Sequence, residues 1–230
     1  QPDKFVEYLL ERVKKGDYRA VFPVTDSTII PVSRYKEDFS RYTLVPAPDY
    51  EVLMKAMDKA ETIKIARGNG IDCPETYVVG NDGVSGLAQE GLQFPVVIKP
   101  RQSSGARGLT ICRDIEELIS RYPVVYRKYG PCLIQEYIPP GGEELGVYTL
   151  LNFESEPRAT VVQKRLRSYP VSGGPSTMRE SVSRPELVEI AHRLLKLLNW
   201  SGIAMVEFRY DPRDKKPKLM EINPRWWGSL

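Results

Sequence analysis

The sequence has very few of the residues on which many enzymes build nucleophiles and zinc sites. It contains one histidine and three cysteines in 230 residues. Cys73, Cys112 and Cys132 are widely spaced and form no C-x-x-C pair, which argues against a disulfide framework or a structural zinc site. His192 lies in the amphipathic pattern 184–200, where a structural role is expected. Hydrolysis that depends on a catalytic histidine is therefore not expected.

Long apolar runs and a strong charge of one sign are also absent. No segment is long enough to span a bilayer, and no signal peptide is recognisable. The net charge of +3 is too small to argue for nucleic acid or membrane partners. The composition is that of a soluble globular protein, which we expect to be cytoplasmic. The chain begins at Gln1 without a methionine and stops at Leu230 directly after a polar strand, so we expect a fragment of a longer protein.

The pattern of apolar residues predicts an α+β chain. Residues 4–26 read as a helix followed by a buried strand of an α/β layer, and 49–69 read as one helix that Gly70 ends. A loop is expected around 172–177. Further strands are expected at 42–46, 76–79, 95–100, 109–112, 132–138, 145–153 and 158–166, with helices at 114–122 and 184–200. Strands that cluster in runs, instead of alternating with helices, are typical of α+β folds.

The strongest chemical signal is LMEINPRWWGSL, residues 219–230. Side chains alternate across a strand, so Glu221, Asn223 and Arg225 should share one face. The preceding stretch GIAMVEFRYD (202–211) reads as the partner strand and is joined to it by a polar turn. The two stretches therefore predict a hairpin with one apolar and one polar face.

This hairpin would bring two acidic side chains together. If it is symmetric about Asp214, Glu207 and Glu221 lie directly opposite each other, with Cβ atoms roughly 5 Å apart. At an effective dielectric constant of about 20 their repulsion is roughly 3 kcal/mol. One carboxyl could keep its proton as a general acid, or a divalent cation could lie between both; the amide oxygen of Asn223 favours Mg²⁺ or Mn²⁺. Taken alone, the hairpin equally fits two acids that meet only water.

The second signal is FPVVIKPRQSSGARGLTIC, residues 94–112. Lys99 lies deep in an apolar strand, and a flexible turn that contains Ser103, Ser104, Gly105 and Gly108 follows it. Glycine lets backbone N–H groups approach phosphate oxygens closely, and a lysine is a fitting point charge for them. The lysine precedes the glycines and a strand follows, so this is neither a Walker A loop nor a Rossmann fingerprint. Without the hairpin, it would read as an ordinary glycine turn.

Together these motifs are the two halves of a Mg²⁺–ATP site. From about Asp49 to Leu230 the chain resembles the ATP-grasp superfamily, in particular the carboxylate–amine ligases and carbamoyl-phosphate-synthase-like proteins. The resemblance implies an ATP-grasp fold, with two α+β lobes that grip ATP, preceded by part of an α/β pre-ATP-grasp domain. Residues 1–48 would be that partial domain, 49–138 the small lobe with its linker helix and glycine-rich flap, and 139–230 the large lobe with the metal site, truncated at its C-terminus.

The resemblance also implies a role for each motif residue. The nucleotide would be bound by two lysines, the flap, an adenine hinge and a ribose carboxylate: Lys59, Lys99, Ser103, Ser104, Gly105, Gly108, Gln135, Glu136, Ile138 and Glu144, with Glu143 as an alternative to Glu144. The cation would be held by Glu207, Glu221 and Asn223. The catalytic arginines would be Arg225 beside the reacting phosphate, and Arg165 and Arg179 as clamps for an acceptor carboxylate. Outside the family context, Lys59 reads as a solvated residue, and the last two arginines as partners of acids such as Glu180.

The implied activity is that of a ligase that uses ATP and Mg²⁺ or Mn²⁺. A substrate carboxylate would take the γ-phosphate to form an acylphosphate, and an amine or similar nucleophile would then displace phosphate. The substrates would be small molecules, and the resemblance leaves a homodimer open. Three alternatives remain: a phosphotransferase, a nucleotide-binding module without ligase activity, and a glycosidase that uses Glu207 and Glu221 as its carboxyl pair.

Overall fold

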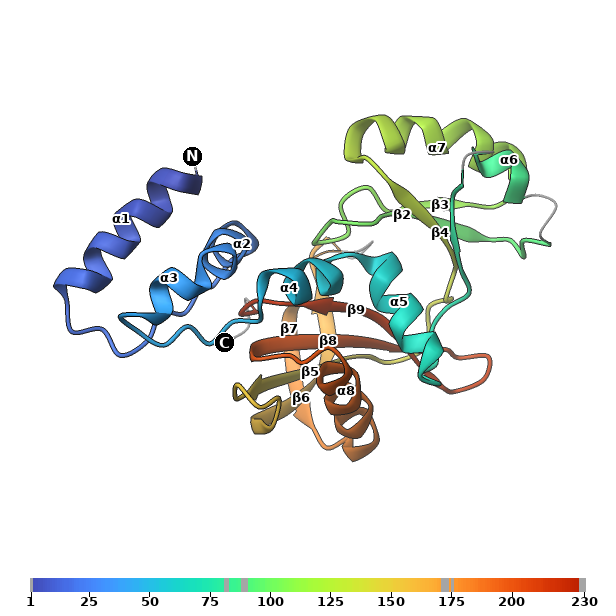
Figure 1. Ribbon diagram of the computed structural model, residues 1–230. Helices are drawn as coiled ribbons and strands as arrows, with labels where there is room; N and C mark the ends of the chain where they lie inside the picture. The colour runs from blue at the N-terminus through green and yellow to red at the C-terminus, as the bar shows by residue number, and fades with distance from the viewer. Residues whose placement is uncertain (1, 81–82, 88–90, 171–173, 175, 228–230) are drawn as a thin grey trace.

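The fold consists of two antiparallel sheets with helices packed on them (Figure 1). The structure, a computed structural model, describes residues 2–80, 83–87, 91–170, 174 and 176–227. One sheet has four strands in the order β1-β4-β2-β3, and the other has five in the order β7-β6-β5-β8-β9. No helix within these residues is long and apolar enough to cross a membrane.

The four-stranded sheet separates an apolar face from a polar one. Its strands are β1 (Thr76–Val78), β2 (Val96–Pro100), β3 (Thr110–Cys112) and β4 (Cys132–Glu136). Helices α6 (Gly83–Leu87) and α7 (Ile115–Tyr129) cover one face and share a core with Val96, Ile98 and Ile134. Because side chains alternate along a strand, Lys99 and Gln135 point to the opposite face. That face lies toward the second sheet (Figure 1).

The five-stranded sheet carries the main core. Its strands are β5 (Glu144–Leu151), β6 (Pro157–Ser168), β7 (Ser176–Val182), β8 (Gly202–Tyr210) and β9 (Pro217–Asn223). Helix α8 (Pro185–Leu197) packs on β5 and β6 through its buried Leu187, Ala191 and Leu194. Helices α4 (Tyr50–Met57) and α5 (Lys59–Gly68) pack against β9. These helices therefore meet the sheet that holds the acidic hairpin.

Three expected elements differ from the structure. Residues 49–69 form two helices instead of one, because Asp58 leaves the helical conformation and caps α5 by accepting a bond from the Ala60 N–H. Helix α7 continues through Pro123 to Tyr129, beyond its expected end at 122. The expected loop at 172–177 overlaps the start of β7, whose mostly exposed STMRESV sequence has no apolar alternation; positions 172, 173 and 175 lie outside the described residues.

The N-terminal region is mainly helical, and the two strands that were expected in it are almost absent. It consists of α1 (Pro2–Lys15), α2 (Asp26–Arg34) and α3 (Lys36–Ser40). The segments expected as strands, near 20–25 and at 42–46, meet only in one parallel bridge between Ala20 and Leu44. A single bridge forms no continuous ladder, so the prediction of full strands in these two segments was wrong.

The N-terminal region is joined to the large sheet at the start of β8. Ser201 Oγ donates a hydrogen bond of 2.9 Å to the carbonyl of Ala47. Gly202 has a φ of +87°, and a Cβ at this position would lie 2.1 Å from the carbonyl oxygen of Pro46. Only glycine fits this close backbone contact.

We therefore predict that Gly202→Ala lowers the free energy of unfolding by about 3 kcal/mol, since it adds backbone strain and a clash with main-chain atoms. Gly68→Ala is the matched control, because a Cβ there meets nothing within 4 Å and alanine favours a helix. Urea unfolding of both variants checks the prediction. Equal midpoints would contradict it.

Candidate functional site

The acidic hairpin has the register that the sequence predicts. Glu207 on β8 pairs directly with Glu221 on β9, and Met205 pairs with Asn223, so the symmetry about Asp214 is confirmed at the acids. Nearer the turn a bulge shifts the pairing by one residue, so that Phe208 faces Leu219. The two carboxylates and the Asn223 amide therefore share one face of the five-stranded sheet.

Cationic and amide groups surround the two carboxylates. Asn223 Nδ2 donates to Glu221 Oε1 at 3.1 Å and lies 3.5 Å from Glu207 Oε1. Lys59 Nζ is 3.2 Å from Glu221 Oε2, and Arg165 Nη2 is 3.8 Å from Glu207 Oε2. Each acid thus has its own cation, which reduces the repulsion between the two.

The two acids differ in their affinity for a proton. Burial raises the pKa of Glu207, and the charge of Glu221 raises it further. Burial alone would raise the pKa of Glu221 as well, but the charge of Lys59 and the hydrogen bond from Asn223 outweigh it, so this pKa is lowered. Glu221 therefore holds a full negative charge more readily than Glu207 does.

This set of donors fits a hard divalent cation. Two carboxylates and an amide oxygen are ligands that Mg²⁺ and Mn²⁺ accept. Asn223 now presents its nitrogen to the acids, so ligation requires the amide to turn and present its oxygen. Among the described residues no three His, Cys, Asp or Glu side chains group as metal ligands, so a cation here would take its other oxygens from water or phosphate.

Both predicted phosphate lysines lie near the acids. Lys59, the first residue of α5, donates 2.6 Å to the carbonyl of Ser103 in addition to its contact with Glu221. Lys99 donates to Gln135 Oε1, and burial lowers its pKa to about 8 against the attraction of Glu221. Arg101 binds Asp58 at 2.6 Å and so fixes the end of β2 to the start of α5. This ion pair therefore keeps the strand that carries Lys99 next to the helix that begins with Lys59.

The glycine-rich loop is anchored at its base and open at its tip. Ser103 is tied by Lys59, and Ser104 accepts a 2.9 Å bond from Arg107 at its hydroxyl. Gly108, at φ +78°, leaves no room for a Cβ, which would lie 2.6 Å from Pro100. Gly105, at φ +66°, has nothing within 4 Å of the same position. A loop of this form can present its backbone to a ligand.

The predicted hinge residues already have protein partners. Gln135 accepts from Lys99 and donates 2.9 Å to Thr76 Oγ1. Glu136 binds Arg213, from the turn after β8, and accepts a 3.1 Å bond from the Glu75 N–H. The carbonyl of the buried Ile138 accepts a 3.4 Å bond from Arg209. The Glu136 side chain and the Ile138 carbonyl therefore connect the two sheets, whereas Gln135 bonds within the four-stranded sheet.

Glu144 belongs to the acidic cluster, and Glu143 does not. Glu144 binds Arg209 and, at 2.9 Å, Arg165, the same arginine that approaches Glu207. Glu143 binds Lys164 and, at 2.9 Å, Arg184. The geometry thus connects Glu144 to the predicted site through a shared arginine.

Arg225 lies beyond the end of β9, so the strand alternation that was expected to place it on the face of Glu221 and Asn223 does not extend to it. Strand β9 ends at Asn223, because Pro224 has no N–H to continue the ladder. Arg225 Nε donates 3.0 Å to Asp26 Oδ1 at the start of α2, and its Nη1 donates 3.2 Å to the Trp226 carbonyl. Its guanidinium is thus oriented by a residue far away in the sequence.

The other two predicted arginines pair across strands β6 and β7, where Arg165 lies opposite Arg179. Arg179 stacks on the Tyr148 ring, with Cζ 5.3 Å from the centroid. Trp227 also packs on Tyr148, with 4.4 Å between the ring centroids.

Sequence reasoning had identified the charged motif residues but missed the residues that position them. Tyr148 and Thr76 lie inside ordinary strand patterns. Asp26, Arg209 and Arg213 are single charged residues with no motif around them, and only the fold brings each to its partner.

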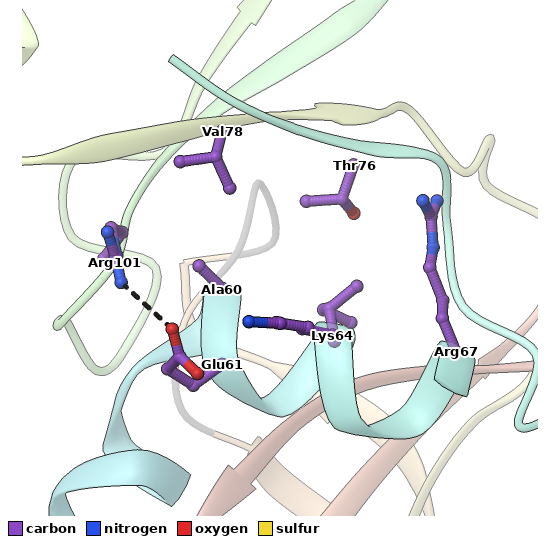
Figure 2. Close-up of a pocket in the computed structure, with 8 residues that line it drawn as sticks. Ala60, Glu61, Lys64, Arg67, Thr76, Val78 and Arg101 are labelled. Carbon is purple, nitrogen blue, oxygen red and sulfur yellow. Dashed lines mark ion pairs between the residues drawn. The ribbon is translucent and has the colours of Figure 1, made fainter. Parts of the chain in front are cut away.

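A cavity of about 410 Å³ lies beside the predicted site, between α5 and β1 (Figure 2). Its lining residues are Ala60, Glu61, Ile63, Lys64, Arg67, Thr76, Val78 and Arg101. Arg101 and Glu61 form a 3.8 Å ion pair across one end of it. None of the predicted site residues lines this cavity, but its lining residue Thr76 is the partner of Gln135, and its lining residue Arg101 is the partner of Asp58.

The curated proteins that resemble this chain include two named enzymes. It is 25% identical over 216 residues to the D-aspartate ligase of Enterococcus faecium (strain Aus0004), a match that covers 84% of this chain and 50% of that protein. It is 24% identical over 187 residues to Biotin carboxylase 1 of Bacillus subtilis (strain 168), covering 74% of this chain and 41% of that protein. The chain thus spans about half the length, or less, of these two curated relatives.

The fold is that of solved ATP-grasp structures. The biotin carboxylase domain of Hydrogenobacter thermophilus 2-oxoglutarate carboxylase, solved with MgADP, ADP and bicarbonate, superposes with a TM-score of 0.78 at 17% identity. That alignment covers 99% of this chain and 52% of the other. The predicted α+β ATP-grasp fold is confirmed. Residues 56–229 match the family model described as an ATP-grasp domain, well over half of the chain, and the protein therefore belongs to the ATP-grasp family.

Proposed function

We propose that this chain binds Mg²⁺–ATP and acts as a ligase that activates a substrate carboxylate and joins it to an amine or similar nucleophile. The observation that carries the proposal is the position of Lys59. It contacts both Glu221 of the acidic hairpin and Ser103 of the glycine-rich loop. The Lys59 side chain thus connects the predicted metal ligands to the loop that is predicted to bind phosphate.

The proposed reaction consists of two transfers. A carboxylate oxygen forms a bond to the γ-phosphorus of ATP while the bond between that phosphorus and the bridging oxygen breaks, and ADP leaves. The amine nitrogen then bonds to the acyl carbon, phosphate leaves with the electron pair of the C–O bond, and the nitrogen loses a proton to solvent. No protein nucleophile is required, which agrees with the scarcity of histidine and cysteine.

The first transfer brings two anions together, so its barrier is largely electrostatic. Glu207, Glu221 and Asn223 would hold Mg²⁺, which supplies positive charge at the phosphates. Lys59 and Lys99 would bind phosphate oxygens, and the loop from Ser103 to Gly108 would cover them and exclude water. The backbone at Glu136 and Ile138 would meet the adenine, with Gln135 beside it and Glu144 at the ribose. Arg225, held by Asp26, would face the reacting phosphate.

The relatives support a small carboxylate as substrate. One is named for D-aspartate and a structural neighbour was solved with bicarbonate, so both act on or bind small carboxylates. For the present chain we propose only that the substrate is a small carboxylate. The division into 1–48, 49–138 and 139–230, and a homodimer, are further proposals; the neighbour from Hydrogenobacter thermophilus is described as a domain dimer.

We predict that Glu221→Gln lowers the rate of phosphate release from Mg²⁺–ATP by at least about a hundredfold, because it removes the charge that holds the cation. The assay screens the full chain against amino acids, bicarbonate and amines. Glu186→Gln, on the exposed start of α8, is the charge-matched control. Activity that survives Glu221→Gln would remove the metal assignment, and a stable phosphorylated acceptor without free phosphate would identify a phosphotransferase.

We predict that Lys59→Met weakens ATP binding about ten- to hundredfold, since it removes a phosphate partner and releases the loop at Ser103. Lys64→Met, one turn further along α5 and exposed, should bind as the wild type does. Calorimetric titration with Mg²⁺ and a non-hydrolysable ATP analogue measures both. Similar affinities for the two variants would remove Lys59 from the nucleotide site.

A further inference from the structure

Two polar atoms in the five-stranded sheet are buried without a hydrogen-bond partner among the described residues. They are Tyr148 Oη and Arg179 Nε. Tyr148 is only 1% exposed, so its hydroxyl has lost its hydrogen bonds to bulk water, and no described residue replaces them. A group in this state costs free energy of folding, and such groups in native proteins generally have a functional or ligand-binding reason.

The Tyr148 hydroxyl lies on the same face of the sheet as the acidic pair. Directly paired residues share a face, and Tyr148 pairs with Met205 as Gly146 pairs with Glu207. A Cβ at Gly146 would lie 2.8 Å from the Tyr148 oxygen, so the phenol extends over Gly146, toward the row that contains Glu207. Glycine at 146 provides the space in which the phenol lies.

Arg179 brings a second donor and a positive charge to the same place. Its guanidinium stacks on the Tyr148 ring at 5.3 Å. Burial lowers the pKa of Arg179, and the negative charge of Glu207 acts against this. Arg165, opposite Arg179, also approaches Glu207, at 3.8 Å. The cluster therefore combines two guanidinium groups with two unused hydrogen-bond donors.

These properties select one class of ligand. An Arg Nε–H can only donate, and a tyrosine O–H beside it can donate too, so the matching group is one that only accepts. A carboxylate has two such oxygens and the opposite charge. In the proposed reaction the carboxylate must also lie next to the cation held by Glu207 and Glu221, which is where this cluster is found.

We propose that Tyr148 Oη joins Arg179, the expected carboxylate clamp, in binding the carboxylate that is to be phosphorylated, and that Tyr148 is a specificity-determining residue that distinguishes this carboxylate from its carboxamide. The inference rests on the proposed function, because it assigns the acceptor subsite of that same site. An amide offers an acceptor oxygen to only one of the two donors and carries no negative charge, so it leaves the other donor unsatisfied and the site rejects it.

The test uses the full chain with Mg²⁺ and a non-hydrolysable ATP analogue. The probes are glycine, both enantiomers of alanine and aspartate, bicarbonate, and glycinamide and alaninamide as neutral analogues of the carboxyl group. Tryptophan emission reports binding, because Trp227 lies 4.4 Å from the Tyr148 ring. We expect a saturable change with at least one carboxylate, none with its amide, and loss of the signal in Trp227→Phe.

The decisive variant is Tyr148→Phe, which should weaken the responding carboxylate about tenfold and leave nucleotide affinity unchanged. Its unfolding midpoint should equal or exceed that of the wild type, because the lost hydroxyl has no described partner. Arg179→Lys keeps the charge without the Nε donor and should weaken the same probe similarly. Tyr210→Phe, on the opposite face of the sheet, is the matched control.

Unchanged carboxylate affinity in Tyr148→Phe would overturn the subsite while leaving the proposed function intact, provided that the wild type binds the nucleotide. A lower unfolding midpoint with unchanged affinity would assign the hydroxyl to a buried water, and overturns it as well. The subsite is also overturned if none of the carboxylate probes changes the tryptophan emission of the wild type. Absence of nucleotide binding by the wild type is the separate result that rejects the proposed function itself.

Discussion

The repulsion between Glu207 and Glu221 is the constraint around which the rest of the site is arranged. The two acids face each other across a hairpin, and the strand register fixes the distance between their Cβ atoms. Lys59 approaches Glu221, Arg165 approaches Glu207, and the Asn223 amide lies near both. Burial raises the pKa of Glu207, and Lys59 and Asn223 lower the pKa of Glu221, so Glu207 retains a proton more readily and Glu221 less readily than an ordinary glutamate. Protein charges thus offset part of the repulsion, and a cation between the acids would offset more.

The compensating charges also connect the two sheets. Lys59 links the hairpin to the glycine-rich loop, and Arg101 binds Asp58 so that the end of β2 stays next to the start of α5. On the opposite side, Arg213 from the β8–β9 turn binds Glu136 at the end of β4. The contacts of Lys59 and Arg101 are partly buried, so water screens them less than it screens the exposed pair of Arg213 and Glu136. Binding of a nucleotide between the sheets would therefore act on contacts that already set their separation.

The acidic register, most strands and the family could be inferred from the sequence because they depend on local patterns. Alternation and the symmetry of one turn were enough to pair Glu207 with Glu221. The break at Asp58 was missed because the apolar pattern runs through it, and only a side-chain cap reveals it. The partnership of Arg225 with Asp26 was missed because 199 residues separate them. Tyr148 escaped notice for another reason: its buried, unpartnered hydroxyl is a property of packing, which a strand pattern does not encode.

The most direct test of the central electrostatic claim is electron paramagnetic resonance of Mn²⁺ added to the full chain with a non-hydrolysable ATP analogue. The double variant Glu207→Gln/Glu221→Gln replaces both charges and keeps the shapes of the side chains. If a cation lies between the acids, the wild type should bind one Mn²⁺ tightly with the nucleotide, and the double variant should lose most of that affinity. Equal Mn²⁺ binding by the two proteins would show that the acids are not the ligands.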